Sequence, residues 1–311
     1  MRDRPYHIPV LAEQVLSALA VKPGGNYLDG TAGGGGHARL VASRLTTGWL
    51  IALDRDPDAV AAASQALEGL PAAVVQANYT EMGQVLDGFG IRTVAGILLD
   101  IGVSSHQLDT PERGFSYHAE DALLDMRMCR TGGSAADLVN TLEQAALADI
   151  FFRFGEEKFS RSIARAVVKA REAAPITTCG ELAAIVSGAV PAAARRDGHP
   201  ARRVFQALRI AVNGELDALA AGLDTAFERL AVGGRLAVIT FHSLEDKIVK
   251  DTFNGWKKSC TCPKGFPVCI CGRTPAARVF APVKPEPAEI AANPRARSAK
   301  LRVLEKIKNK E

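Results

Sequence analysis

Short apolar runs alternate with helical stretches in the N-terminal part of the chain. Continuous apolar runs are typical of strands buried on both faces of a parallel sheet. Their alternation with helices is the signature of β-α-β units. The pattern therefore predicts an α/β fold with strands at residues 26–29, 49–54, 72–76 and 94–100 and helices at 37–45 and 58–67.

The pattern changes after residue 108, where helices joined by turns replace the alternation. Thr141 and Thr178 each start an S/T-x-x-E/Q sequence typical of a helix-capping box. A helical apolar stripe and strand-type runs then return, and the Pro- and Ala-rich residues 273–299 are predicted to be irregular. The returning elements are predicted at residues 215–230, 236–240 and 300–304. We therefore expect a sheet domain in two parts, residues 1–108 and 214–311, interrupted by a helical insertion at 109–213.

The composition is that of a globular protein. Of 311 residues, 47% are hydrophobic and 23% are charged, which excludes global disorder, a collagen-like fibre and a disulfide miniprotein. The apolar runs are too short to cross a bilayer, so no membrane association is expected. The charged N-terminal segment lacks the apolar region of a signal peptide. We expect a cytoplasmic protein with reduced cysteines.

Positive charge is concentrated in two segments. Residues 151–215 carry a net charge of +5 and residues 247–311 carry +10, whereas residues 1–150 carry −8. This asymmetry indicates a polyanionic partner, and the alternative is a solvated basic face without a ligand. Helical spacing places several basic side chains where they would contact phosphates. They are Arg161, Arg165 and Lys169 on one predicted helix, and Arg195, Arg196, Arg202, Arg203 and Arg209 on or beside another.

Residues 30–36 form a glycine-rich turn between a predicted strand and a predicted helix. Glycines let a ligand approach the backbone amides closely. The loop has no G-K-[ST] sequence, which argues against a P-loop. Asp54, at the end of the second strand, suits the ribose of either NAD or S-adenosylmethionine. Asp29 discriminates between them, because a carboxylate repels a pyrophosphate but attracts ammonium and sulfonium groups. The alternative is a turn that serves only helix–strand packing.

Four further segments resemble one family, the bacterial 16S rRNA cytosine-N4 methyltransferases, also described as the ribosomal RNA small subunit methyltransferase H family. The segments are residues 30–37, 53–57, 98–109 and 240–249, supported by 113–117, 125–128 and 293–298. The resemblance implies a class I (Rossmann-like) S-adenosylmethionine-dependent methyltransferase sheet with an inserted all-helical domain for RNA recognition. It also implies methylation of the exocyclic N4 amine of a decoding-region cytosine, with 16S rRNA and the small ribosomal subunit as partners. We also consider a homodimer.

The resemblance carries cofactor contacts onto specific positions of this sequence. They are Gly34, Gly35, Gly36, His37, Asp54, Tyr79, Asp100 and Gln107. Gly34 departs from the larger, often basic residue of the family, so that side-chain contact is lost. Leu123 and Cys129 also depart from the proline and acidic residue expected beside the Asp-Met-Arg-Met motif. Without the resemblance, Tyr79 would be interpreted as an ordinary half-buried tyrosine.

Methylating a cytosine amine is chiefly a positioning problem, because the nitrogen lone pair is delocalised into the ring. The expected catalytic residues follow the strand ends and are Asp100, Ser104, Ser105 and His242. An alternative for the last region is a helix cap formed by Ser243, with Asp246 in the first turn. No cysteine nucleophile is needed, so Cys129 and Cys179 are expected to be structural. The sequence has no G-x-S-x-G elbow of a hydrolase.

Two C-x-C pairs bring four cysteines close together in the chain, at Cys260, Cys262, Cys269 and Cys271. Four thiolates can form a tetrahedral zinc site. The usual zinc spacing is C-x₂-C, so the alternative is a set of reduced thiols that simply pack. The sequence leaves both interpretations open.

Two other functions compete with an RNA amine methyltransferase. One is a non-catalytic RNA-binding ribosome assembly factor that retains the cofactor fold, and the other is an NAD-dependent oxidoreductase. The carboxylates of Asp54 and Asp100 argue against the first, and Asp29 argues against the second.

Overall fold

The computed structural model describes residues 9–193, 198–260, 262, 271 and 274–309. The chain divides into two compact units, Met1–Gly102 with Leu216–Glu311, and Val103–Glu215. The second unit includes residues 103–108, which the sequence pattern placed with the sheet. Val103 and Leu108 join it because both pack against its hydrophobic core.

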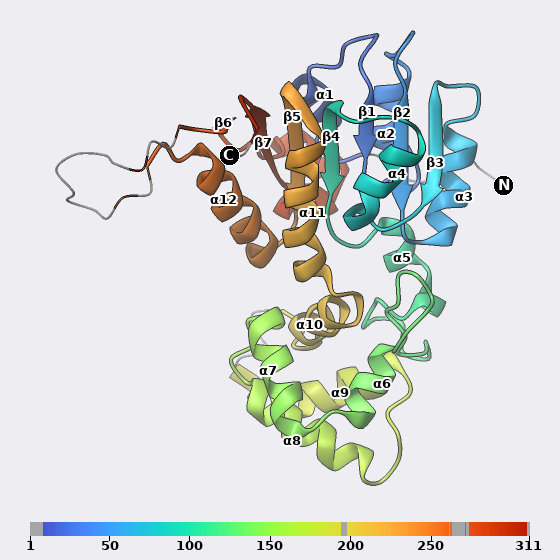
Figure 1. Cartoon of the computed structure of the whole chain (residues 1–311). Coiled ribbons are helices and arrows are strands. Elements are labelled where there is room, and N and C mark those ends of the chain that lie inside the picture. Colours follow the sequence, from blue (N-terminus) through green and yellow to red (C-terminus); the bar gives the residue numbers. More distant parts are fainter. Residues whose placement is uncertain (1–8, 194–197, 261, 263–270, 272–273, 310–311) are drawn as a thin grey trace. The chain divides into compact units, whose positions relative to one another are not determined.

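The first unit is built on one seven-stranded sheet of order β3-β2-β1-β4-β5-β7-β6 (Figure 1). Strands β1 to β5 are parallel, whereas β7 is antiparallel to both β5 and β6. The order reverses direction beside β1, as in doubly wound nucleotide-binding sheets. The predicted Rossmann-like α/β fold is therefore confirmed. The strands are β1 Tyr27–Asp29, β2 Leu50–Asp54, β3 Ala72–Gln76, β4 Val94–Asp100, β5 Leu230–Thr240, β6 Ala277–Val279 and β7 Lys300–Lys306.

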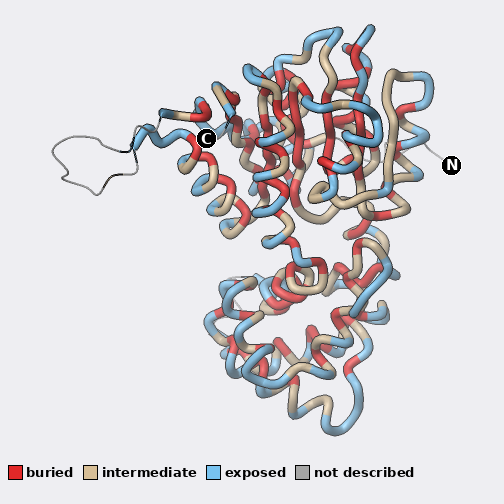
Figure 2. Tube along the Cα trace, viewed as in Figure 1, coloured by how far each residue is buried: buried red, intermediate tan, exposed pale blue. Residues whose placement is uncertain are grey.

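Successive residues of the central strands enter different cores, one on each face of the sheet. Tyr27 and Leu98 belong to one core, whereas their neighbours Leu28 and Ile97 belong to the other. Both faces are covered, which explains the continuous apolar runs, and Figure 2 shows these strands largely buried. Helices α1 Ala12–Leu19, α2 Gly36–Ala42 and α3 Pro57–Ala66 supply the first core, and α4 Met82–Gly88, α11 Glu215–Arg229 and α12 Ser243–Lys257 supply the second.

The second unit is helical and has its own hydrophobic core. Thr178 caps α9 in the predicted capping box, because its side chain accepts the Glu181 N–H. The predicted capping box at Thr141 is wrong, since Thr141 ends α6 and α7 starts after Glu143. The elements are α5 Ser105–Asp109, η2 Pro111–Arg113, α6 Ala135–Thr141, α7 Gln144–Gly155, α8 Ser160–Arg171, α9 Cys179–Ala189 and α10 Ala201–Asn213.

Two sequence predictions near the C-terminus need correction. Strand β5 starts at Leu230 rather than after the glycine pair, and its register with β4 shifts between Leu230 and Arg235, where Gly233 has a φ of 82°. The segment 273–299 is not mainly irregular. It contains β6, α13 Pro287–Ala292 and the short helix η4 Pro294–Ser298. Another short helix, η1 Tyr79–Glu81, follows β3 in the first part of the sheet unit.

Within the part of the chain that the structure describes, no helix is both long and apolar enough to cross a membrane.

Candidate functional site

Three carboxylates stand at the carboxyl ends of neighbouring parallel strands. Asp29 ends β1, Asp54 ends β2 and Asp100 ends β4. The sheet order reverses between β1 and β4, and ligands of such sheets bind outside the strand ends at this point. The structure thus brings together three acidic side chains that are far apart in the sequence.

The glycine-rich loop is tied to the same strand ends by backbone hydrogen bonds. The Gly30 N–H donates to the Leu98 carbonyl at 2.9 Å, and the Ala32 N–H donates to the Leu53 carbonyl at 2.8 Å. Gly35 has a φ of 81°, and a Cβ there would lie 2.8 Å from the Cβ of Ala66 in α3. Only glycine fits at this position, where α2 begins directly against α3.

Asp54 anchors this loop. Its carboxylate accepts the Gly33 N–H at 2.8 Å and the Asp56 N–H at 2.9 Å. Burial raises the pKa of Asp54, and these two donors only partly oppose the shift. Each carboxylate oxygen can accept more than one hydrogen bond, so Asp54 retains acceptor capacity for ribose hydroxyls.

Thr31 links the Asp29 carboxylate to the backbone of Asp100, a role that sequence reasoning missed. The Thr31 N–H donates to Asp29 Oδ1 at 3.0 Å, and the Asp100 N–H donates to the Thr31 hydroxyl at 2.6 Å. Asp29 Oδ2 and Asp100 Oδ1 are buried and have no hydrogen-bond partner among the described residues. Buried acceptors left in this way are costly without a donor or a cation.

His37, in the first turn of α2, completes the charged cluster. Its Nε2 lies 3.6 Å from Asp100 Oδ2, and its side chain is only 8% exposed. Burial alone lowers the pKa of His37, but the carboxylates of Asp100 and Asp29 raise it overall. Burial raises the pKa of Asp29 to about 6, although His37 and the Thr31 N–H act in the opposite direction. The predicted contacts Gly34, Gly35 and Gly36 lie between Thr31 and His37.

Tyr79 follows β3 and starts η1, where it is half-buried. Its ring packs on α11, since a Cβ at Gly222 would lie 2.5 Å from the ring. It also contacts the hydrophobic core beneath the sheet. This packing agrees with the alternative of an ordinary half-buried tyrosine, and stacking on adenine stays a prediction.

Ser104, Ser105 and Gln107 belong to the helical unit, not to the sheet unit. Ser104 caps α5 by accepting the Gln107 N–H at 3.1 Å, and Gln107 Oε1 accepts the Ser104 N–H at 3.0 Å. Ser105 is the first residue of that helix. The sequence interpretation missed this capping box, although S-x-x-Q is its signature. Catalysis by the two serines and cofactor binding by Gln107 stay predictions.

His242 precedes α12 and is held by a buried acid. Its Nε2 lies 2.9 Å from Glu245 Oε1, and the Glu245 side chain is fully buried. Glu245 also accepts the N–H groups of Phe241 and His242. His242, not Ser243, is therefore the N-cap residue, and the predicted Ser243 cap is wrong. Asp246 lies in the first turn of α12, as that alternative predicted, and it pairs with Lys300 and Arg302 of β7 at 2.7 and 2.6 Å.

The two cysteines of the helical unit have structural surroundings. Cys179 is buried, its Sγ lies 3.4 Å from the Gly114 carbonyl, and burial raises its pKa to about 11. Such a thiol is not a nucleophile at neutral pH. Cys129 contacts Thr131 instead, with 3.4 Å between the hydroxyl oxygen and Sγ.

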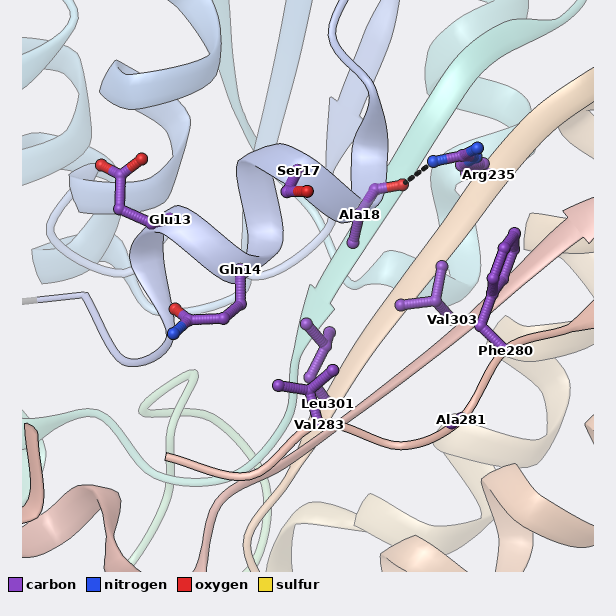
Figure 3. Close-up of a pocket in the computed structure, with 10 residues that line it drawn as sticks. All are labelled: Glu13, Gln14, Ser17, Ala18, Arg235, Phe280, Ala281, Val283, Leu301 and Val303. Atoms are coloured by element: carbon purple, nitrogen blue, oxygen red, sulfur yellow. Dashed lines mark hydrogen bonds between the residues drawn. The ribbon is translucent and has the colours of Figure 1, made fainter. Parts of the chain in front are cut away.

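A separate pocket of about 560 Å³ lies between α1 and the β5–β7 part of the sheet (Figure 3). Val303, Leu301 and Phe280 give it apolar walls, and Arg235 lies over the Phe280 ring at 5.2 Å. None of the predicted cofactor contacts lines it. The strand ends, where the acidic groups converge, remain the candidate site.

Comparisons with known proteins identify similar chains. A model of the MraW methylase family matches residues 4–307. The ribosomal RNA small subunit methyltransferase H of Symbiobacterium thermophilum is 52% identical over 309 residues, covering 97% of each chain. That of Geobacter sp. strain M21 is 50% identical, covering 97% of this chain and 99% of the relative. A solved rRNA methylase from Streptococcus thermophilus has 12% identity, 99% coverage of both chains and a TM-score of 0.44.

Proposed function

Because the chain belongs to the MraW methylase family, we propose that it methylates the exocyclic N4 amine of a decoding-region cytosine in 16S rRNA. S-adenosylmethionine is the cofactor. The observation that carries the proposal is the set of carboxylates of Asp29, Asp54 and Asp100 around the glycine-rich loop. The relatives that match over nearly the whole chain are named for small-subunit rRNA methylation, which supports the substrate class.

The charge of the site favours this cofactor over a dinucleotide. A pyrophosphate beside Asp29 and Asp100 would bring like charges together in a poorly solvated place. S-adenosylmethionine carries an ammonium and a sulfonium, and the buried Oδ2 of Asp29 has no donor among the described residues. We assign Asp29 to the cationic part of the cofactor and Asp54 to its ribose. The competing function of an NAD-dependent oxidoreductase is therefore disfavoured.

Asp100 is the residue that we assign to the amine. The bound cofactor supplies an electrophilic methyl group on sulfur. Oδ1 of Asp100 is buried and free to accept an N–H, and His37 lies against the other carboxylate oxygen at 3.6 Å. A hydrogen bond from the amine N–H to Oδ1 of Asp100 fixes the orientation of the amine. It favours a geometry in which the nitrogen lone pair is no longer conjugated with the cytosine ring and points toward the methyl group. As the methyl group moved to nitrogen, the S–C bond would break with its electron pair left on sulfur, and the surplus amine proton would leave to a nearby acceptor, for which Asp100 is positioned.

Mass spectrometry of 16S rRNA from cells with and without the gene tests the function directly. We expect one methylated cytidine to disappear on deletion and to return with the wild-type gene. If the deletion strain has a ribosome assembly defect and a variant that binds RNA but does not methylate it corrects this defect, the non-catalytic assembly factor would be supported instead.

The affinity for S-adenosylmethionine should rise with pH through about 6, because Asp29 ionises there and then attracts the cationic cofactor. The same pKa shift acts on folding with a defined sign. Between about pH 4 and 6, Asp29 keeps its proton in the folded state but has lost it in the unfolded state. The free energy of unfolding therefore falls by about 3 kcal/mol as the pH rises from about 4 to 6. Calorimetric titrations at several pH values measure the first effect, and urea melts measure the second.

Asp29→Asn is the matched control for this pH dependence. It keeps the shape of the side chain but cannot ionise, so both pH trends should flatten. A pH-dependent affinity that is unchanged in this variant would show that another group, such as His37, is responsible.

The helical unit offers a basic surface for RNA. Arg161, Arg165 and Lys169 lie on successive turns of α8, and all three are exposed. Arg202 and Arg203 of α10 are also exposed, and the predicted Arg195 and Arg196 lie outside the described residues. Arg209 needs correction as a predicted phosphate contact, because its guanidinium is bound by both carboxylate oxygens of Glu215 at 2.8 and 2.9 Å.

Stacked rings accompany this charge. Tyr117 and His199 are stacked with centroids 4.6 Å apart, and His118 lies 4.3 Å from Tyr117. His118 and His199 are exposed, and the Arg202 N–H donates to the His199 carbonyl. Proteins that bind single-stranded RNA commonly combine such rings with arginines. This supports RNA recognition by the helical unit.

The variant Arg161→Ala/Arg165→Ala/Lys169→Ala should bind small-subunit RNA more weakly and with a flatter salt dependence. Each lost phosphate contact lowers the slope of log affinity against log salt by about 0.7–0.9. The affinity for S-adenosylmethionine should not change, because the glycine-rich loop lies in the other unit. Filter binding at several salt concentrations measures the slope.

The matched control removes three exposed basic side chains from the sheet unit, through Lys22→Ala/Arg44→Ala/Arg92→Ala. It loses the same formal charge and should keep the wild-type slope. If both variants weaken binding equally, α8 does not contact the RNA specifically. If neither does, the basic C-terminal segment must hold it.

A further inference from the structure

Three thiols converge just beyond the end of α12. The sulfur atoms of Cys260, Cys262 and Cys271 all lie within 4.8 Å of one another, although the first and the last are eleven positions apart in the chain. The Cys260 and Cys271 sulfurs are 3.8 Å apart. A disulfide requires about 2.05 Å. Zinc–thiolate bonds of about 2.3 Å in a tetrahedron place two sulfurs about 3.8 Å apart. The distance between the Cys260 and Cys271 sulfurs therefore matches that between two thiolates bound to one zinc ion.

The backbone around the first pair suits a thiolate. The Cys262 N–H donates to the Cys260 sulfur at 3.4 Å. A hydrogen bond to the charged form of a group stabilises that form, and metal ligation requires the thiolate. Lys257 and Lys258 precede the pair and add positive charge, which offsets the single negative charge of three thiolates with one divalent ion.

The residues that flank the thiols, Trp256 before them and Ala276 after them, are joined by a backbone hydrogen bond. The Ala276 N–H donates to the Trp256 carbonyl at 2.9 Å, and both residues are buried. Between them, every described residue is exposed or only partly buried. Among those residues no apolar core is present to hold the segment, which is the situation in which small structures use a metal clip.

We propose that Cys260, Cys262 and Cys271 bind one zinc ion through their thiolates and that this ion closes the loop between Trp256 and Ala276. Borderline-soft Zn²⁺ matches a sulfur donor set, whereas Mg²⁺ and Ca²⁺ require oxygen. Cys269, the remaining member of the two C-x-C pairs, lies outside the described residues, and the proposal does not depend on it.

The test uses the full chain, purified under reducing conditions without an affinity metal. After loading with zinc and dialysis, elemental analysis should find one equivalent per chain. Loading the stripped protein with cobalt(II) instead should give the visible bands of a tetrahedral site and a thiolate charge-transfer band. Zinc well below one equivalent, or a cobalt spectrum without thiolate charge transfer, would overturn the proposal.

Cys271→Ser identifies the ligands. It should weaken zinc binding at least about a hundredfold in competition with a chromophoric chelator. Cys129→Ser, which changes a cysteine of the helical unit, should leave it unchanged. Because Cys260 and Cys271 are exposed, serine there should leave the hydrophobic core of the sheet unit folded even if the loop loses its metal, which a thermal melt checks. Wild-type zinc affinity in both Cys271→Ser and Cys260→Ser would refute the site.

Discussion

Asp100→Asn should lower kcat/KM for RNA methylation by about a hundredfold to a thousandfold, the range for loss of one buried polar group that acts on the reacting centre. The asparagine keeps the shape of the side chain but removes the negative charge. Oδ1 of Asp100 is buried without a partner among the described residues, so this carboxylate is available to an amine. Initial rates with small ribosomal subunits as substrate measure the effect.

Folding should survive this change. The hydrogen bond from residue 100 to Thr31 uses the backbone N–H, which asparagine retains. Asp87→Asn is a suitable control because Asp87 is an exposed carboxylate of the same unit, paired with Arg229 at 2.6 Å. If Asp100→Asn lowered the melting temperature while activity per folded molecule stayed near wild type, Asp100 would be a loop-stabilising residue and not a catalytic one.

Asp54→Ala should weaken S-adenosylmethionine binding by about 1.5–3 kcal/mol, or roughly tenfold to more than a hundredfold in Kd. Two effects add. The ribose loses a charged acceptor, and the N–H groups of Gly33 and Asp56 lose theirs, which frees the glycine-rich loop. Isothermal titration calorimetry below the melting temperature measures the affinity.

Two variants separate these effects. Asp54→Asn retains one acceptor oxygen and should keep part of the affinity. Glu68→Ala removes an exposed carboxylate beyond α3 and should bind like wild type. A lower melting temperature of Asp54→Ala with unchanged affinity would mean that Asp54 only anchors the loop and does not contact the ribose.

The sequence predicted the features that depend on near neighbours. Apolar runs between helices identified β1 to β4, because strands buried on both faces need continuous apolar residues. Asp29, Asp54 and Asp100 were placed at one edge, since the carboxyl ends of parallel strands share an edge. The cap at Thr178 was also correct, because a capping box spans only four residues.

Only the tertiary structure decided the contacts between distant segments. Thr31, which donates to the Asp29 carboxylate, accepts the N–H of Asp100 sixty-nine positions later in the chain, and Cys271 meets Cys260. Arg209 was predicted to face phosphate, but it pairs with Glu215 once α10 ends. Such partners depend on how whole elements pack, and no local pattern records that packing. The sequence by itself therefore determined the kinds of elements and the site edge, whereas packing determined which side chains are paired and which remain available for chemistry.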